Sequence, residues 1–143
     1  MIESNQEQEK QLAAVGKKFN LRFIILHGSY AKGTPYTGSD LDIAVLGRRR
    51  IGLDESLDIH GELGRIFGDN EERELDLKTL HQVDPFFRYL VVRDGILLFG
   101  DGTEYEEFRA YAFRDYMDSA DLRKLEFRLL EKSIKELSQS YAG

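Results

Sequence analysis

Cysteine is absent from this 143-residue sequence. Its absence excludes disulfides, thiolate nucleophiles and zinc sites built from thiolates. A chain of this length buries roughly 70% of the surface that it exposes when unfolded, so it needs no covalent staple. A cysteine-free chain is compatible with a reducing compartment, and we expect a cytoplasmic protein.

Long apolar runs and an excess of positive charge are also missing. No apolar stretch approaches the roughly 20 residues of a membrane-spanning helix, and the polar start MIESNQEQEKQ does not fit a secretory signal. The formal net charge is −6, which argues against broad nucleic-acid binding, because that affinity comes largely from Lys and Arg. One small anionic ligand remains compatible with this charge, since a bound metal ion can invert the local field.

The densest basic cluster is formed by Arg48, Arg49 and Arg50, directly after an expected strand. A solvated loop is the simpler interpretation of three consecutive arginines in this position. Contact with a partner or a ligand is the alternative.

The hydrophobic pattern predicts helices and strands that alternate along the chain. Four short runs rich in β-forming residues predict strands, over residues 21–26, 41–46, 72–80 and 96–99. Three segments with helical spacing precede the C-terminal region, over residues 5–18, 53–67 and 85–92. Asp84 is the expected N-cap of the third, with Pro85 at its first position. Glycine-rich residues 28–38 are expected to form a turn that contains one short helical turn.

This order predicts an α/β (α+β) fold, with helices packed on a small mixed sheet. We expect a single domain over residues 1–143, with a core over about residues 20–100 and a helical extension over about 103–141. Within the extension, we expect the helix to be broken near Asp118 and Ser119.

The extension carries an apolar stripe with spacings of three and four residues. We call this set the C-terminal stripe, and it comprises Phe127, Leu130, Ile134, Leu137 and Tyr141. The stripe is expected to pack on the protein's own sheet. The alternative is a surface for another helical protein.

Two acids, Asp40 and Asp42, stand one residue apart at the start of the expected strand 41–46. Alternate side chains of a strand point to the same face, so the two carboxylates project together while Leu41 points the other way. Keeping both carboxylates ionised costs free energy, because the two negative charges repel each other. A shared Mg²⁺ ion resolves the conflict, because it commonly binds one or two carboxylates together with phosphate oxygens.

The Gly28–Ser29 pair follows the first strand, where a turn into a helix exposes backbone N–H groups to an anion. Glycine lets that backbone approach phosphate closely, and the serine hydroxyl adds a donor. Lys32 is a candidate phosphate contact from the same turn, although an exposed lysine is more often only solvated.

A third acid, Asp76, lies between Leu75 and Leu77 on the third expected strand. If that strand neighbours the second, Asp76 lies beside Asp40 and Asp42. It is then placed to ligate a metal and to act as the general base for an attacking hydroxyl. Taken alone, it is an outward-facing acid on a half-exposed strand.

Gly28–Ser29, ten intervening residues and Asp40-x-Asp42, with Asp76 further on, resemble the motif of the minimal nucleotidyltransferases of the DNA polymerase β superfamily. The likeness covers about residues 20–80. It continues through DPFFRYLVVRDGILLFGDGTEYEEF, which is similar to the antitoxin branch that is paired with HEPN toxins. His27 departs from the aromatic residue expected before the Gly-Ser pair, and we assign it no catalytic role.

The resemblance implies transfer of AMP from Mg-ATP to an acceptor hydroxyl, with release of pyrophosphate. It implies two Mg²⁺ ions held by Asp40, Asp42 and Asp76, and β- and γ-phosphates held at Gly28 and Ser29. The implied acceptor is a helical HEPN-type toxin, encoded as a short neighbouring protein with an Arg-x4-His motif.

Two other functions stay open at this point. One is nucleotidyl transfer to a small molecule such as an aminoglycoside, although few residues remain for a separate substrate domain. The other is a non-catalytic antitoxin that blocks its partner by occlusion, which the intact set of three acids disfavours.

Overall fold

The computed structural model describes residues 5–142, so residues 1–4 and 143 of the expected domain lie outside it. Its helices are α1 (Gln6–Lys18), α2 (Gly28–Lys32), α3 (Leu53–Phe67), α4 (Pro85–Asp94) and α5 (Gly102–Ala142). Its strands are β1 (Leu21–His27), β2 (Leu41–Gly47), β3 (Leu75–Thr79) and β4 (Ile96–Phe99). The predicted order of elements is therefore confirmed.

Side-chain caps fix the beginnings of two helices, as their sequences indicate. The Asn5 side chain accepts a hydrogen bond from the backbone N–H of Gln8 at 2.8 Å and begins α1. Asp84 accepts from the N–H of Phe86 at 3.0 Å, and Pro85 occupies the first turn of α4. The predicted N-cap of α4 is thus confirmed.

The four strands form one mixed sheet with the order β3-β2-β1-β4. β1 pairs antiparallel with both β2 and β4, whereas β3 pairs parallel with β2. The parallel pairing requires a crossover connection, and α3 supplies it. The expectation of a small mixed sheet is confirmed.

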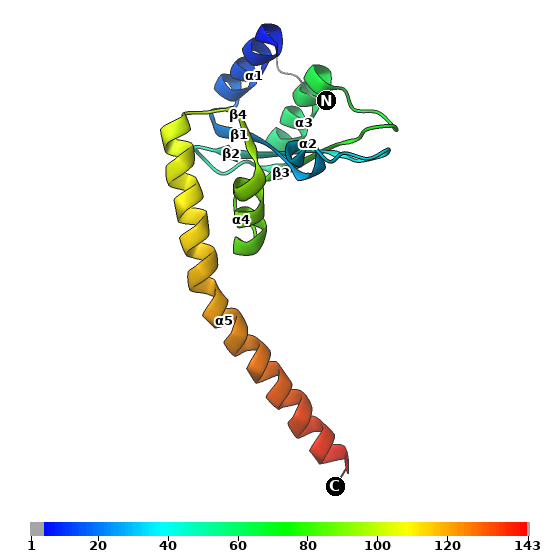
Figure 1. Ribbon diagram of the computed structural model, residues 1–143, viewed down its shortest axis with the longest axis vertical. Coiled ribbons are helices and arrows are strands. Elements are labelled where there is room, and N and C mark those ends of the chain that lie inside the picture. The colour runs from blue at the N-terminus through cyan, green and yellow to red at the C-terminus, as the bar shows by residue number, and fades with distance from the viewer. Residues whose placement is uncertain (1–4, 143) are drawn as a thin grey trace.

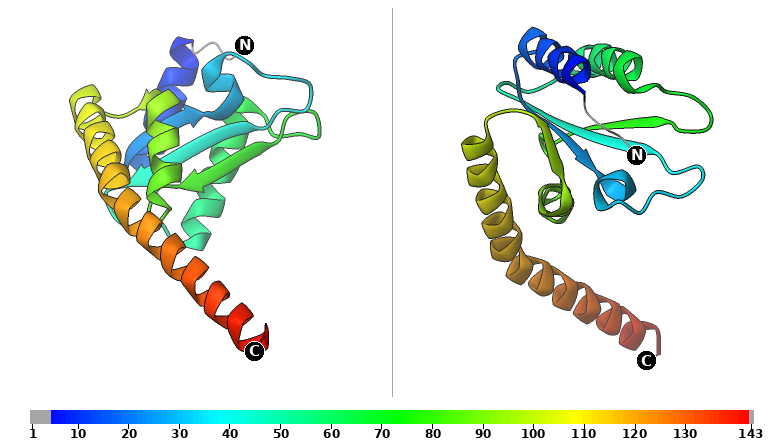
Figure 2. Two further views of the ribbon diagram at one scale, coloured as in Figure 1. Left: turned by 60° about the horizontal axis from the view of Figure 1, so that its bottom comes forward. Right: turned by 45° about the horizontal axis from the view of Figure 1, so that its top comes forward.

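Helices cover both faces of the sheet (Figures 1 and 2). An apolar core lies between the sheet and the helices on each face. On one face, α1 and α3 pack over strand residues such as Ile24 and Ile43. On the other, α4 and the first half of α5 pack over Phe23 and Ala44. Because strand side chains alternate between faces, the position of a residue along a strand decides which core it joins.

Strand β3 is shorter than the 72–80 predicted from alternation, since it spans only Leu75–Thr79. The difference lies before the strand, where the Asn70 side chain accepts hydrogen bonds from the backbone N–H groups of Glu72 and Arg73. An asparagine that bonds backbone in this way offers it an alternative to the sheet. A polar turn therefore replaces the first residues of the predicted strand.

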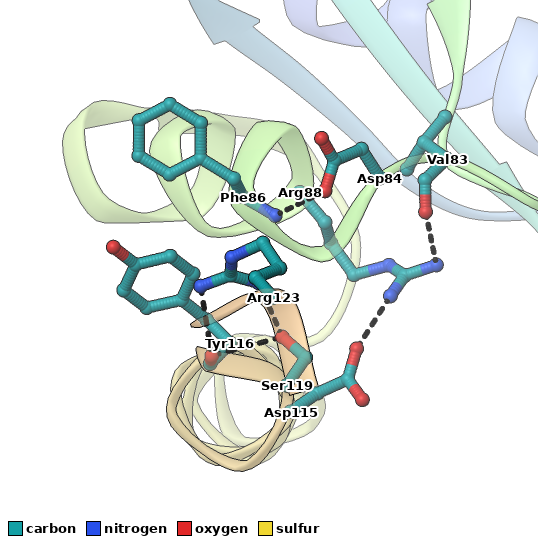
Figure 3. Close-up of polar contacts among 8 residues, drawn as sticks. All are labelled: Val83, Asp84, Phe86, Arg88, Asp115, Tyr116, Ser119 and Arg123. Atoms are coloured by element: carbon teal, nitrogen blue, oxygen red, sulfur yellow. Dashed lines mark hydrogen bonds and ion pairs between the residues drawn. The ribbon is translucent and has the colours of Figure 1, made fainter. Parts of the chain in front are cut away.

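The break expected near Asp118 and Ser119 does not occur, because α5 continues from Gly102 to Ala142. Ser119 is accommodated inside the helix: its hydroxyl donates to the carbonyl of Tyr116 at 2.9 Å and accepts from Arg123 at 2.6 Å (Figure 3). Such back-bonding bends helices without ending them.

The two halves of α5 have different surroundings. Tyr105, Phe108 and Ala112 are buried against the sheet and α4. In contrast, every side chain from residue 124 to residue 141 is exposed, and this half projects from the body (Figure 1). A helix of 41 residues is about 60 Å long, far longer than the sheet that it packs on.

The C-terminal stripe therefore does not pack on the protein's own sheet, and that expectation is wrong. The last ring contacts between α5 and α4 come from Phe113 and Tyr116, which lie against Tyr89 at 5.8 Å and 5.0 Å between ring centroids.

In residues 5–142, no helix is long and apolar enough to span a membrane.

Candidate active site

Gly28 forms the sharp turn from β1 into α2 that the sequence predicts. Its φ of +72° lies in the left-handed region, which L side chains rarely adopt. A Cβ added at this position would collide with the carboxylate of Asp42. Glycine is therefore required both by the backbone conformation and by the close approach of the acid.

Asp42 and Asp76 lie directly opposite each other in the parallel pairing of β2 and β3. On the other side, Asp42 is aligned with His27 of β1. Aligned residues of neighbouring strands share a face of the sheet, so these three side chains form one row beside α4. The third strand thus neighbours the second, which was the condition for a role of Asp76, and it brings Asp76 to Asp42.

Asp42 is electrostatically strained in this row. Burial, the charges of Asp76 and Asp40, and a hydrogen bond with Asp76 raise the pKa of Asp42 from 3.8 to about 6. Partial burial removes water that would stabilise the anion, and neighbouring acids disfavour a further negative charge. A raised pKa of this kind is typical of sites built to bind a cation or to move a proton.

Asp40 lies outside the strands that hold the other two acids. It is exposed just before β2, although its charge still acts on Asp42. Within residues 5–142, no three His, Cys, Asp or Glu side chains are grouped tightly enough to hold a metal ion. The structure thus brings Asp42 and Asp76 together and leaves Asp40 at the solvent edge of the row.

Lys78 is a neighbour of the acids that sequence reasoning missed. Its ammonium nitrogen lies 3.5 Å from a carboxylate oxygen of Asp76. The signal was present in the sequence, because Asp76 and Lys78 are two residues apart on a strand and share a face. Lys78 partly compensates the negative charge of the row and is exposed enough to move.

His27 also belongs to this row, although its sequence gave no reason to assign it a role. Its Nε2 is buried and has no hydrogen-bond partner, and its ring packs edge-on against Phe87 of α4 at 6.0 Å. Burial is the main cause that lowers the pKa of His27 from 6.5 to about 4, with Lys78 contributing in the same direction and Asp76 opposing it. His27 is therefore neutral near pH 7.

The two other residues of the predicted phosphate turn lie on α2. Ser29 is half-buried, and its carbonyl accepts the backbone N–H of Thr34 at 2.9 Å, which closes the turn. Lys32 is exposed and lies 3.8 Å from the carboxylate of Asp94 in α4. An ion pair of this length on the surface is weak and does not fix Lys32 in place.

The donor set of the row fits a hard divalent cation. Asp42 and Asp76 offer carboxylate oxygens on opposite residues of neighbouring strands, and the charge of the exposed Asp40 acts on Asp42. Mg²⁺ prefers such ligands and retains open positions for water and phosphate oxygens. A cation would also relieve the repulsion that raises the pKa of Asp42.

A comparison with known families identifies the fold that carries this row of acids. Residues 9–104 match the family described as polymerase beta, nucleotidyltransferase. The chain belongs to this nucleotidyltransferase family. The matched segment contains all four strands, the Gly28–Ser29 turn and the three acids.

Relatives of this nucleotidyltransferase include an enzyme with a named activity. The chain is 29% identical, over 138 residues, to the protein adenylyltransferase MntA of Aphanizomenon flos-aquae. This match covers 87% of the chain and 85% of the relative.

Solved structures share the nucleotidyltransferase fold over most of the chain. One is a chain of a toxin–antitoxin crystal structure with AMP-PNP, with a TM-score of 0.68 and 23% identity, covering 85% of this chain and 98% of the other. Another comes from a tri-AMPylated HEPN toxin in complex with the MNT antitoxin of Shewanella oneidensis, with a TM-score of 0.63 and 21% identity. That match covers 87% of this chain and 98% of the other.

Proposed function

We propose that this chain transfers AMP from ATP to a hydroxyl group of a partner protein, as the antitoxin of a HEPN-type toxin–antitoxin pair. The observation that carries the proposal is the alignment of Asp42 with Asp76 beside the Gly28 turn, in a chain of the nucleotidyltransferase family. The named activity of the Aphanizomenon relative and the AMPylated toxin of the Shewanella complex support protein as the acceptor.

In this proposal Asp40, Asp42 and Asp76 would hold two Mg²⁺ ions. When bound, the ions supply neutralisation of the acids and of the triphosphate, and they polarise the α-phosphate. The backbone of Gly28 and the hydroxyl of Ser29 bind the β- and γ-phosphates, and Lys32 adds a positive charge at the same turn.

The chemical step needs one proton acceptor, and the proposal assigns this role to Asp76. The acceptor oxygen forms a bond to the α-phosphorus while the bond from that phosphorus to the bridging oxygen of pyrophosphate breaks. The proton of the hydroxyl passes to the Asp76 carboxylate, and pyrophosphate leaves with the electron pair of the broken bond.

The exposed half of α5 supports a protein acceptor. The C-terminal stripe leaves large apolar side chains in solvent, among them Phe127 at 61% and Leu130 at 58% exposure. A contiguous exposed apolar surface is typical of a protein-interaction site. We assign the stripe to the helical partner and place the pair in the cytoplasm, which fits a cysteine-free chain.

Two alternatives remain distinct from this proposal. Transfer to a small molecule requires a further region that binds this substrate, and few residues of the chain lie outside the sheet, its covering helices and the projecting half of α5. Neutralisation by occlusion alone requires no acids, and the alignment of Asp42 with Asp76 at an electrostatic cost argues against it.

The test is incubation of the chain with α-labelled ATP, Mg²⁺ and the protein encoded by the neighbouring reading frame. We expect label on the partner, release of pyrophosphate and loss of labelling in Asp42→Asn, while that variant still binds the partner. Tight binding of the partner with no label from the wild type would instead establish occlusion. Label on an aminoglycoside but not on the partner would establish the small-molecule reaction.

A further inference from the structure

A second charged site lies at the end of the sheet opposite the acids. Gly47 ends β2 five residues after Asp42, which places the two ends about 16 Å apart. Beside Gly47 is a hollow of about 520 Å³. Its charged lining is almost entirely basic and comprises Arg22, Arg48, Arg49, Arg50 and Arg88, with His81 among them. We call this the arginine hollow.

Two of these arginines are held in place by the fold. Arg22 lies over the ring of Phe23 at 5.0 Å and over that of Phe108 at 5.9 Å. The Arg88 side chain is only 13% exposed, and it donates to Asp115 at 3.1 Å and to the carbonyl of Val83 at 3.5 Å (Figure 3). Aromatic and acidic contacts thus orient both guanidinium groups before any ligand arrives.

The positive charge of the hollow is only partly balanced. Arg22 and Arg48 share Glu104, at 3.5 Å and 3.7 Å, whereas Arg49 and Arg50 form no ion pair with any residue in 5–142. Glu104 and Asp115 pair with Arg22, Arg48 and Arg88, and an adjoining hollow lined by Arg22 and Arg48 also contains Glu9 and Asp101. The uncompensated positive charge is therefore that of Arg49 and Arg50. Glu55, in the adjoining hollow that also contains Lys18, is the other acid near Arg49 and Arg50.

His81 lines the same hollow, and the neighbouring positive charge affects its pKa. Its Nε2 accepts a hydrogen bond from the backbone N–H of Gly47 at 3.0 Å, which holds the ring beside residues 48–50. Burial, followed by the charges of Arg50 and Arg88, lowers the pKa of His81. The charges of Arg50 and Arg88, which are the smaller causes of this lowering, favour an anion in the same space.

We propose that the arginine hollow binds a compact phosphate-bearing anion, such as inorganic pyrophosphate or the polyphosphate group of a free nucleotide. A guanidinium group can donate two parallel hydrogen bonds to phosphate oxygens, and an anion would offset the charges of Arg49 and Arg50, which form no ion pair with any residue in 5–142. A long nucleic acid fits less well, because the chain as a whole carries a net charge of −6. This site does not depend on the function proposed for the acids.

The test is a titration of the full chain with inorganic pyrophosphate in EDTA, followed by NMR and calorimetry. Without metal, the three acids repel the anion, so binding reports on the arginine hollow. We expect shifts confined to residues 47–52 and 80–82, and a rise in the measured pKa of His81. Arg49→Gln with Arg50→Gln should weaken binding about tenfold or more, since charged hydrogen bonds are lost.

Arg128→Gln with Lys132→Gln removes the same charge from the exposed half of α5 and serves as the matched control, with unchanged affinity expected. Equal weakening in both double variants, or shifts spread over the whole surface, would overturn the proposal. Stronger binding of a polyglutamate peptide than of pyrophosphate would also overturn it, in favour of an acidic protein. ATP and a single-stranded oligonucleotide, titrated in parallel, distinguish a free nucleotide from a nucleic-acid backbone as the source of the phosphate.

Discussion

At the scale of single residues, the site is dominated by the cost of placing Asp42 beside Asp76. The raised pKa of Asp42 means that the folded state holds a proton between pH 3.8 and about 6 that the unfolded chain releases. The contribution of Asp42 to the free energy of unfolding therefore falls as the pH rises through this window. Above it, the charged pair stays destabilising unless a cation is bound.

Replacing Asp42 by Asn should remove this cost while it preserves the shape of the side chain. We expect Asp42→Asn to melt at the same or a higher temperature than the wild type at pH 7.5 in EDTA, with the advantage shrinking as the pH is lowered toward 4. Thermal unfolding at several pH values measures this. A mutant that melts several degrees lower at pH 7.5 would show that Asp42 is a structural hydrogen-bond partner and not a strained acid.

His27 has the opposite dependence on pH. The unfolded chain gains a proton at this residue below pH 6.5, whereas the folded state resists it until about pH 4. The stabilising effect of a neutral His27 is therefore lost as the pH falls through that range. Wild-type stability between pH 4 and 6 reflects both residues with opposite signs, so single variants are needed to separate them.

His27→Phe should stabilise the protein, because Phe keeps the ring contact with Phe87 and removes a buried Nε2 that has no partner. An unsatisfied buried polar atom costs about 1–3 kcal/mol. We expect a higher melting temperature at pH 7 and a larger gain at pH 5, measured by thermal unfolding in EDTA. A gain that is no larger at pH 5 than at pH 7 would contradict the lowered pKa.

At the scale of elements, α5 is one helix with two environments. Its first half is a core element, since Tyr105, Phe108 and Ala112 are buried. Its second half has no core to join, so its helical structure depends on local propensity and on the continuity of the first half. In the proposed toxin–antitoxin pair, the partner covers the apolar residues of this segment.

The partner-binding role of the C-terminal stripe can be tested with two matched double variants. Leu130→Gln with Ile134→Gln changes the stripe, and Leu125→Gln with Leu129→Gln makes the same kind of change on another face of the helix. The four side chains are similarly exposed, at 58%, 55%, 52% and 55% respectively. Glutamine keeps helix propensity high, so neither variant should unfold the helix.

We expect the stripe variant to bind the helical partner about tenfold or more weakly, because a buried Leu or Ile contributes about 1.5–3 kcal/mol. Isothermal titration with the partner measures the affinities, and labelling from ATP should fall in parallel at low partner concentration. Equal affinity of both variants would exclude the stripe as the docking face. A wild type that forms a dimer on its own, lost only in the stripe variant, would assign the stripe to a second copy of the chain.

At the scale of the whole molecule, opposite charges occupy opposite ends of the sheet. Acids gather where β2 begins, and arginines gather where it ends. In the proposed function the negative end requires cations before a nucleotide can bind, so the stabilisation that this end contributes should appear only when metal and nucleotide are present together. The positive end requires none, which keeps the two sites experimentally separable.

Mg²⁺ and ATP together should raise the melting temperature of the wild type, because a ligand bound only by the native state stabilises it by mass action. At about 100 times the dissociation constant the gain is about 2.7 kcal/mol. Differential scanning fluorimetry with EDTA, Mg²⁺ alone, ATP alone and both ligands measures this. Asp42→Asn should lose most of the gain that both ligands give beyond ATP alone, and a mutant that kept all of this difference would defeat the metal-site assignment.

The sequence by itself determined the elements and the motif. Alternation in 41–46 and the Asp84–Pro85 pair predict a strand and a helix start because both signals are local, and the structure has both. Gly28 could be identified because its backbone conformation is one that other residues avoid. The polar turn at Asn70 was missed, because side-chain bonding to the backbone competes with a strand that alternation alone favours.

Only the tertiary structure decided which residues meet. The parallel pairing of β2 with β3 sets Asp42 opposite Asp76, and the antiparallel pairing with β1 adds His27 to the row. These contacts join strands far apart in sequence, so no local pattern contains them. The same holds for α5, because the sequence pattern of its apolar stripe would be identical if a sheet covered the stripe or if solvent surrounded it. Periodicity identifies an apolar face of a helix. In the structure this face is uncovered because α5 extends well beyond the sheet and α4.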